Sequence, residues 1–260
     1  MFYVRYLIKQ VGDITEKDFG GYDSEYNYIN AATEAGYSTL SYDRIGTGKS
    51  TKADSHLRNG SLSEFASISI PNPSKVVQVG HSFGSALVNA LAETEPSLSD
   101  VIVLTGYSSN TTWTVSFAIA SNFPIAAETD PQRFGEYDKG SLTWADELAN
   151  QYAFFRYPYF DPDVLAAAER NKMPAAIGEI LILEPTDSPA WTGPVLLISA
   201  DQDHVLCGGK CHGILSQAKQ LFPNAETYVQ PNMGHFMNLH FNATAFYGVV
   251  NDFVGGNVVL

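Results

Sequence analysis

The sequence predicts a doubly wound α/β fold with a mostly parallel sheet and an inserted helical cap. Short apolar, β-branched runs alternate with helical patterns, and several runs are apolar on both faces, as in a parallel sheet covered by helices. The predicted strands are residues 36–43, 75–82, 100–108, 193–201 and 225–231. The predicted helices are residues 24–35, 84–95, 210–221 and 243–254. This alternation is typical of the α/β class.

One interval interrupts the alternation. Residues 109–190 contain no comparable strand but hold the aromatic runs "NTTWTVSFAIASNFP" and "YAFFRYPYFDP". We therefore divide the chain into an α/β core, residues 1–108 and 191–260, and a helical cap, residues 109–190; the alternative is a series of surface helices. An apolar pocket under such a cap would be shaped by its aromatic side chains, although packing within the cap would explain them equally well. The candidates for substrate binding are Trp113, Trp144, Phe154 and Phe155.

Composition excludes several classes of function. The 260 residues carry a formal net charge of −13, and no cluster of Lys and Arg is present, so we expect no nucleic-acid partner. No stretch approaches the ~20 apolar residues of a membrane span, and the first residues do not resemble a signal peptide. We expect a small-molecule substrate as partner, whereas compartment and oligomeric state stay undetermined.

The stretch "YDRIGTGKS", residues 42–50, resembles a phosphate-binding loop. Such a loop needs a glycine five positions before Gly48, where this chain has Asp43, and a helix should follow instead of a polar stretch. The sequence therefore argues against a nucleotide site. We expect Asp43 and Arg44 to organise this turn by charge-assisted hydrogen bonds.

The strongest motif is Gly80-His81-Ser82-Phe83-Gly84, which follows the strand "KVVQV" and precedes a helix. A nucleophile on a sharp strand-to-helix turn needs neighbours without a Cβ atom, and the two glycines meet this need. Ser82 is the predicted nucleophile, and the N–H of Phe83 is the predicted oxyanion donor. The alternative is an ordinary strand-to-helix turn.

A serine needs a base, and the base needs an acid to orient it. His235 follows the last predicted strand and is our preferred base, with His240 as the alternative. Asp203, a few residues past the strand 193–201, is the preferred acid, with Asp201 as the alternative. The order Ser, Asp, His, each after a separate strand, is the order used by one large hydrolase fold.

Two cysteines, Cys207 and Cys211, flank a Gly-Gly-Lys turn. The glycines allow a tight loop, so a disulfide is one interpretation. Zinc could use the same cysteines with His204 and His212, but structural zinc sites usually draw ligand pairs from two separate segments. We expect no metal site, and the disulfide stays open.

These motifs identify a resemblance to the α/β-hydrolase superfamily, within it the capped serine esterases and lipases, with detail similar to fungal members. The matching stretches are "EYNYINAATEAGYSTLSYDRIGTGKS", "KVVQVGHSFGS", "PVLLISADQD" and "NMGHF". The family usually has a His-Gly loop that supplies a second oxyanion N–H; here residues 17–23 lack it, and Gly20 or Gly21 would have to substitute. Few residues separate Ser50 from Lys75, where the family places a helix. We therefore hypothesise an N-terminally shortened hydrolase.

The resemblance implies a serine hydrolase that cleaves an ester or related acyl bond of an apolar small molecule. Ser82 would attack, His235 would transfer the proton, Asp203 would orient His235, and no cofactor would be needed. The alternative is a weak or inactive hydrolase-fold protein that binds an apolar ligand or a partner, because one oxyanion donor is missing from the sequence pattern.

Overall fold

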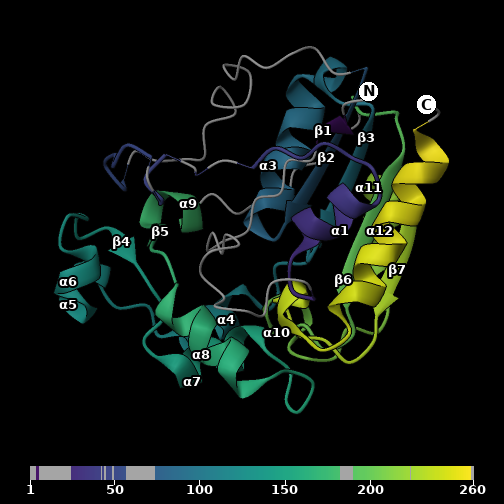
Figure 1. Ribbon diagram of the computed structural model, residues 1–260. Helices are drawn as coiled ribbons and strands as arrows, with labels where there is room; N and C mark the ends of the chain where they lie inside the picture. Colours follow the sequence, from purple (N-terminus) through teal and green to yellow (C-terminus); the bar gives the residue numbers. More distant parts are fainter. Residues whose placement is uncertain are drawn as a thin grey trace.

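The computed structural model describes residues 4–5, 25–41, 43, 45–48, 50–56, 74–181, 190–222 and 224–258. Within them a five-stranded sheet has the order β1-β2-β3-β6-β7, and every neighbouring pair is parallel (Figure 1). Its strands are β1 (Val4–Arg5), β2 (Lys75–His81), β3 (Val101–Thr105), β6 (Val195–Ala200) and β7 (Glu226–Gln230). The predicted α/β class is confirmed.

Helices cover both faces of this sheet. On one face, α1 and α12 pack against side chains such as Val101 and Val103; on the other, α3 and α11 pack against Ile102 and Leu104. Successive strand residues point to opposite faces, so a fully buried strand must be apolar throughout, as β3 is. The helix bounds are α1 (Tyr28–Glu34), α3 (Phe83–Thr94), α11 (Ile214–Leu221) and α12 (Ala243–Asn257), close to the predicted ranges.

Two expectations about strands were wrong. Of the predicted strand 36–43, the structure describes 36–41 and 43, and there only Leu40 makes a β-bridge. Polar Ser and Thr residues surround Leu40, so this stretch has little apolar surface to bury in a sheet. Conversely, none of the predicted strands lies near the start of the chain, but Val4–Arg5 pairs with Lys75 and Val76 of β2. Backbone pairing over two residues leaves no periodic pattern in the sequence.

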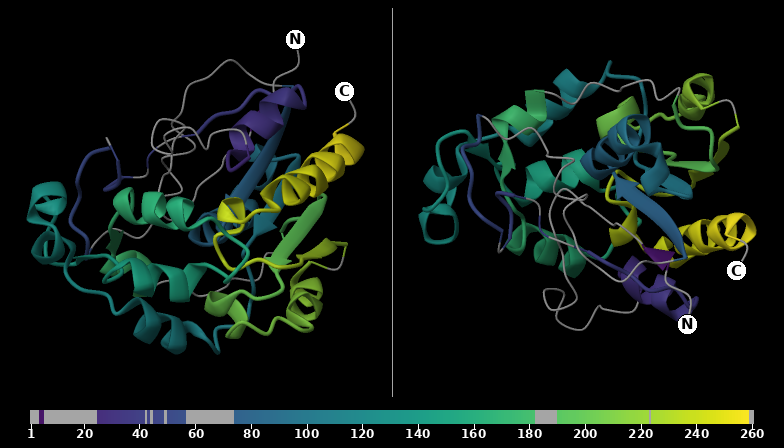
Figure 2. Two further views of the ribbon diagram at one scale, coloured as in Figure 1. Left: turned by 60° about the horizontal axis from the view of Figure 1, so that its bottom comes forward. Right: turned by 90° about the horizontal axis from the view of Figure 1, so that it is seen from above.

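Residues 109–181 lie beyond the carboxyl ends of the strands. In Figures 1 and 2 helices α4 to α8 gather there, away from the two termini. The elements are α4 (Thr114–Ser121), α5 (Ala126–Thr129), α6 (Pro131–Phe134), β4 (Ser141–Leu142), α7 (Glu147–Phe154), α8 (Pro162–Arg170), β5 (Ala175–Ala176) and α9 (Ile177–Leu181). A third core of mostly aromatic and small side chains joins α7 and α8 to Phe236 and Leu239. A cap function for this segment stays a prediction.

No helix in the described part of the chain is both long and apolar enough to span a membrane.

Candidate active site

Ser82 occupies the sharp turn between β2 and α3, with φ 53° and ψ −120°. Non-glycine residues rarely adopt a positive φ, so the surrounding structure must hold this strained conformation. Gly80 shows how closely the strand and the helix approach, because a Cβ atom there would lie 2.5 Å from the carbonyl oxygen of Gly84. This is the arrangement that raises a serine hydroxyl above the edge of a sheet.

The structure brings Ser82, His235 and Asp203 into one hydrogen-bonded row. His235 Nε2 lies 2.7 Å from Ser82 Oγ, and His235 Nδ1 lies 2.7 Å from Asp203 Oδ2. Asp203 and His235 are fully buried, at 0% and 1% exposure. Since a carboxylate can only accept, Nδ1–H donates to Asp203, and Nε2 is left to accept the hydroxyl proton of Ser82.

Asp203 is itself held in place by the chain that follows β6. It is the N-cap of α10 (His204–Cys207), and its Oδ1 accepts the N–H of Leu206 at 2.9 Å. Cys207 and Cys211 form a disulfide, one of the two interpretations that the sequence left open, and it closes the loop directly after Asp203.

The alternative base and acid have other partners. His240 donates from Nδ1 to the carbonyl oxygen of Phe236, and its Nε2 accepts the N–H groups of Gly234 and Arg156, each at 3.0 Å. Burial lowers the pKa of His240 to about 4, against smaller opposing effects, so the ring stays neutral at neutral pH. Asp201 Oδ1 accepts the N–H of Met233 at 3.2 Å. Both residues therefore support the loops that carry His235 and Asp203.

His81, next to Ser82, is a neighbour of the site that sequence reasoning passed over. Its ring lies 5.1 Å from that of His235, and its Nδ1 lies 3.0 Å from Thr105 Oγ1. Because Thr105 donates its own proton to the carbonyl oxygen of Gly80, its oxygen accepts Nδ1–H of His81. Desolvation by burial, followed by the nearby His235, lowers the pKa of His81 well below its usual value. A neutral His81 places no competing positive charge against His235.

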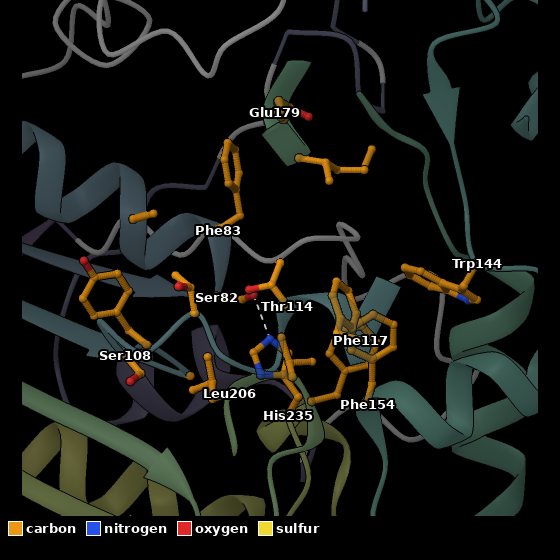
Figure 3. A pocket seen from close by; sticks show the side chains of 18 of the residues that line it. Ser82, Phe83, Ser108, Thr114, Phe117, Trp144, Phe154, Glu179, Leu206 and His235 are labelled. Carbon is orange, nitrogen blue, oxygen red and sulfur yellow. Dashed lines mark hydrogen bonds between the residues drawn. The ribbon is translucent and has the colours of Figure 1, made fainter. Parts of the chain in front are cut away.

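A pocket of about 140 Å³ opens beside Ser82 and His235 (Figure 3). Most of its lining is apolar, with a few hydroxyl groups and one carboxylate, that of Glu179, among the described lining residues. The apolar lining comes from Phe83, Ala86, Gly106, Tyr107, Phe117, Phe123, Leu142, Trp144, Phe154, Met173, Ala175, Ile180, Val205, Leu206 and Phe236. Such a lining suits an apolar small molecule.

The four aromatic residues expected in this pocket divide into two pairs. Trp144 and Phe154 line it, whereas Trp113 and Phe155 do not. Trp113 is 38% exposed and its indole contacts Gly208, while Phe155 is buried against Phe160 and His240. Phe154 is the last residue of α7 and faces the pocket, whereas Phe155 lies just past the helix end and its ring packs against Phe160 and His240 instead.

Of the expected oxyanion donors, Phe83 alone lies among the residues that the structure describes. Phe83 is the first residue of α3, so its N–H belongs to the helix N-terminus beside Ser82. Gly20 and Gly21 lie outside the described residues, as do Arg44 and residues 57–73 of the short interval before Lys75. In the described part of the turn at residues 42–50, the Asp43 carboxylate lies against Gly48. Ser50 Oγ donates a hydrogen bond to the carbonyl oxygen of Asp43.

One group of metal-ligand side chains occurs in the described part of the chain, away from this pocket. Ligand atoms of Asp54, His56 and Asp138 lie within 4.8 Å of one another, and all three residues are exposed. Asp138 already accepts the N–H of Ser55 and the hydroxyl of Ser141. Burial acts to raise the pKa of Asp138, but these hydrogen bonds together outweigh it and leave the pKa lowered. Nothing further points to an ion there.

Comparisons with known proteins agree with this fold. A thermophilic esterase from Thermogutta terrifontis is similar at TM-score 0.68 and 11% identity, covering 100% of this chain and 91% of that one. A bromoperoxidase from Bacillus anthracis gives 0.67 and 16% (98% and 92% covered), and the methylesterase MES16 from Arabidopsis gives 0.65 and 14% (98% and 100%). These identities show a shared fold. No curated protein matches the sequence significantly.

A protein-family model assigns the chain to a family. The model described as the alpha/beta hydrolase family matches residues 19–247, which include Ser82, Asp203 and His235. The match therefore spans most of the chain, and the chain belongs to the alpha/beta hydrolase family.

Proposed function

We propose that the protein is a serine hydrolase that cleaves an ester or related acyl bond of an apolar small molecule. Family membership supports hydrolase activity. The observation that carries the finer proposal is the row Ser82–His235–Asp203, with 2.7 Å at each contact, opening onto an apolar pocket. Residues 109–190, of which the structure describes 109–181 and 190, would serve as the cap of this pocket.

The chemistry follows from the positions of the donors and acceptors. Ser82 Oγ bonds to the carbonyl carbon while its proton passes to His235 Nε2, and the carbonyl electron pair moves onto oxygen near the Phe83 N–H. Collapse of this intermediate breaks the bond to the leaving alcohol, which takes the proton from His235. Water then repeats the sequence on the acyl-serine, releases the acid and restores Ser82. Asp203 keeps His235 in the required tautomer throughout.

A fluorophosphonate probe tests the proposal, because it phosphonylates a serine whose hydroxyl is activated by a neighbouring base. We expect one mole of label per mole of protein, and none in Ser82→Ala. Ser108→Ala is the matched control, since Ser108 lines the same pocket but its Oγ accepts the N–H of Asn110 instead of facing an imidazole. No labelling of wild-type protein with a native circular dichroism spectrum would refute the proposal and support the alternative, a non-catalytic module that binds an apolar ligand.

A further inference from the structure

Trp144 forms the wall of the pocket on the far side of Phe154 from His235. The ring of Phe154 lies 6.0 Å from that of His235 and 4.9 Å from that of Trp144. In Figure 3, Phe117 and Phe154 lie between His235 and Trp144. An apolar group attached to the reacting carbonyl must therefore pass Phe154 before it reaches the indole. The two centroid separations limit the row to about 11 Å, which an extended alkyl chain of about eight carbons covers at roughly 1.3 Å per C–C bond.

One buried ion pair holds Trp144 at both its backbone and its side chain. Lys172 Nζ donates to the carbonyl oxygen of Trp144 at 2.8 Å, and Trp144 Nε1–H donates to Glu169 Oε2 at 2.9 Å. Glu169 and Lys172 bond to each other at 2.5 Å, which closes the ring of contacts. Their side chains are only 19% and 5% exposed, so water competes little for these bonds.

The remaining contacts of the pair strengthen the restraint. Glu169 Oε2 also accepts an N–H of Asn150 at 3.1 Å, so the carboxylate is held from α7 as well as from Lys172. The backbone of Lys172 is in turn fixed, because Arg133 donates to its carbonyl oxygen at 2.7 Å. The indole cannot rotate without breaking its bond to a carboxylate that two other donors, Lys172 and Asn150, hold in place. Buried ion pairs seldom stabilise a fold more than apolar residues would, but they do impose one geometry.

We propose that the Glu169–Lys172 pair positions Trp144 as the end wall of the pocket, which selects substrates with an apolar arm of about eight carbons over those with a short arm. This inference rests on the proposed function for its substrate class. Glu169 and Lys172 are positioning residues, because they act through Trp144 and do not line the pocket. A short arm ends before the indole and gains nothing from its orientation.

A double-mutant cycle of Trp144→Phe and Glu169→Gln tests this role. Trp144→Phe deletes the N–H donor yet leaves Glu169 bonded to Lys172 and Asn150, so it avoids an unpaired buried charge. Glu147→Gln is the matched control, since Glu147 is an exposed carboxylate on the same group of helices and lies outside the pocket lining. Thermal melts identify any variant that does not fold.

The readout is the ratio of kcat/KM for long-arm to short-arm substrates. Two series cover both sides of the ester bond: p-nitrophenyl octanoate against acetate, and octyl acetate against ethyl acetate. Each buried methylene is worth about fourfold in binding, so misplacing a wall that contacts one or two of them lowers the ratio by about four- to fifteen-fold. We expect this loss in at least one series for both single variants, little further loss in the double variant, and no change in Glu147→Gln.

The outcomes separate this inference from the proposed function. An unchanged ratio in Trp144→Phe in both series would overturn the inference, as would losses that multiply independently in the double variant. If wild-type protein neither hydrolyses an ester nor binds the fluorophosphonate, the proposed function fails. In that case calorimetry measures the affinity of the same variants for ethyl octanoate and ethyl acetate. A reduced preference for ethyl octanoate in the variants would support the inference, and an unchanged preference would refute the inference.

Discussion

His240 makes the fold sensitive to acid at one identifiable place. The ring is fully buried, accepts two backbone N–H groups at Nε2 and donates from Nδ1, so it has no room for a second proton. Burial lowers its pKa from 6.5 to about 4. The unfolded chain therefore binds a proton at a higher pH than the folded chain does. The corresponding stability is fully present above pH 6.5 and is lost as the pH falls towards 4.

The size of this loss follows from the two pKa values. Acidification from pH 7.5 to pH 4 should cost about 3 kcal/mol of unfolding free energy at this residue alone. Other groups titrate in the same range, so the measurement is a difference between wild type and His240→Gln. Glutamine keeps one donor and one acceptor but has no proton to gain. His81, buried and neutral in both proteins, cancels in the comparison.

Urea unfolding followed by circular dichroism at pH 7.5, 6, 5 and 4 provides the assay. Wild type should lose about 3 kcal/mol more than His240→Gln across this range, whatever the variant costs at pH 7.5. If the two proteins lose stability in parallel, His240 does not carry the proposed proton linkage, and the account of its burial is wrong.

The two remaining predictions concern backbone restraints around the site. Gly234→Ala should lower the free energy of unfolding by about 1–3 kcal/mol and reduce kcat, because the new Cβ would lie 2.6 Å from the carbonyl oxygen of Phe154. Gly248→Ala is the control, since a Cβ there meets nothing within 4 Å. Equal melting temperatures and rates for the two variants would contradict the argument. Replacing Cys207 and Cys211 together by serine should lower the unfolding free energy by about 2 kcal/mol, the chain-entropy value for so short a loop. Denaturant titration measures this loss, and unchanged stability would show that the reduced loop is equally ordered.

The central strands could be predicted because burial on both faces leaves a continuous apolar run. Strand β3, "VIVLT", is buried at every residue, and no helix or loop of that length needs such a run. The short edge strand Val4–Arg5 has no comparable sequence signal, because only its backbone pairing with β2 makes it a strand. The stretch around Leu40 was wrongly predicted as a strand, because Ser38, Thr39 and Ser41 leave it little apolar surface to bury.

The hydrogen-bonded row could be predicted because each member follows a recognisable strand. Parallel strands place their carboxyl ends at one edge, so Ser82, Asp203 and His235 had to be near one another once the strands were known. The pocket lining could not be predicted in the same way. Trp113 and Trp144 are indistinguishable as letters, and tertiary packing alone turns one towards solvent and the other inward.

The loop after β7 links the candidate base to the aromatic wall of the pocket. The N–H of Phe236 donates to the carbonyl oxygen of Phe154 at 2.9 Å, and the two rings stack with centroids 4.2 Å apart. His240 joins Gly234 to Arg156 through its Nε2. The residues on either side of His235 are therefore both tied to residues 154–156. Phe236 is bonded directly to Phe154, and Gly234 is linked to Arg156 through the His240 ring. Because the same short segment of chain fixes the imidazole and carries Phe154, a movement of α7 would change the pocket and the base together. This coupling predicts that a Cβ at residue 234 or a charged ring at residue 240 would disturb the base and the pocket together.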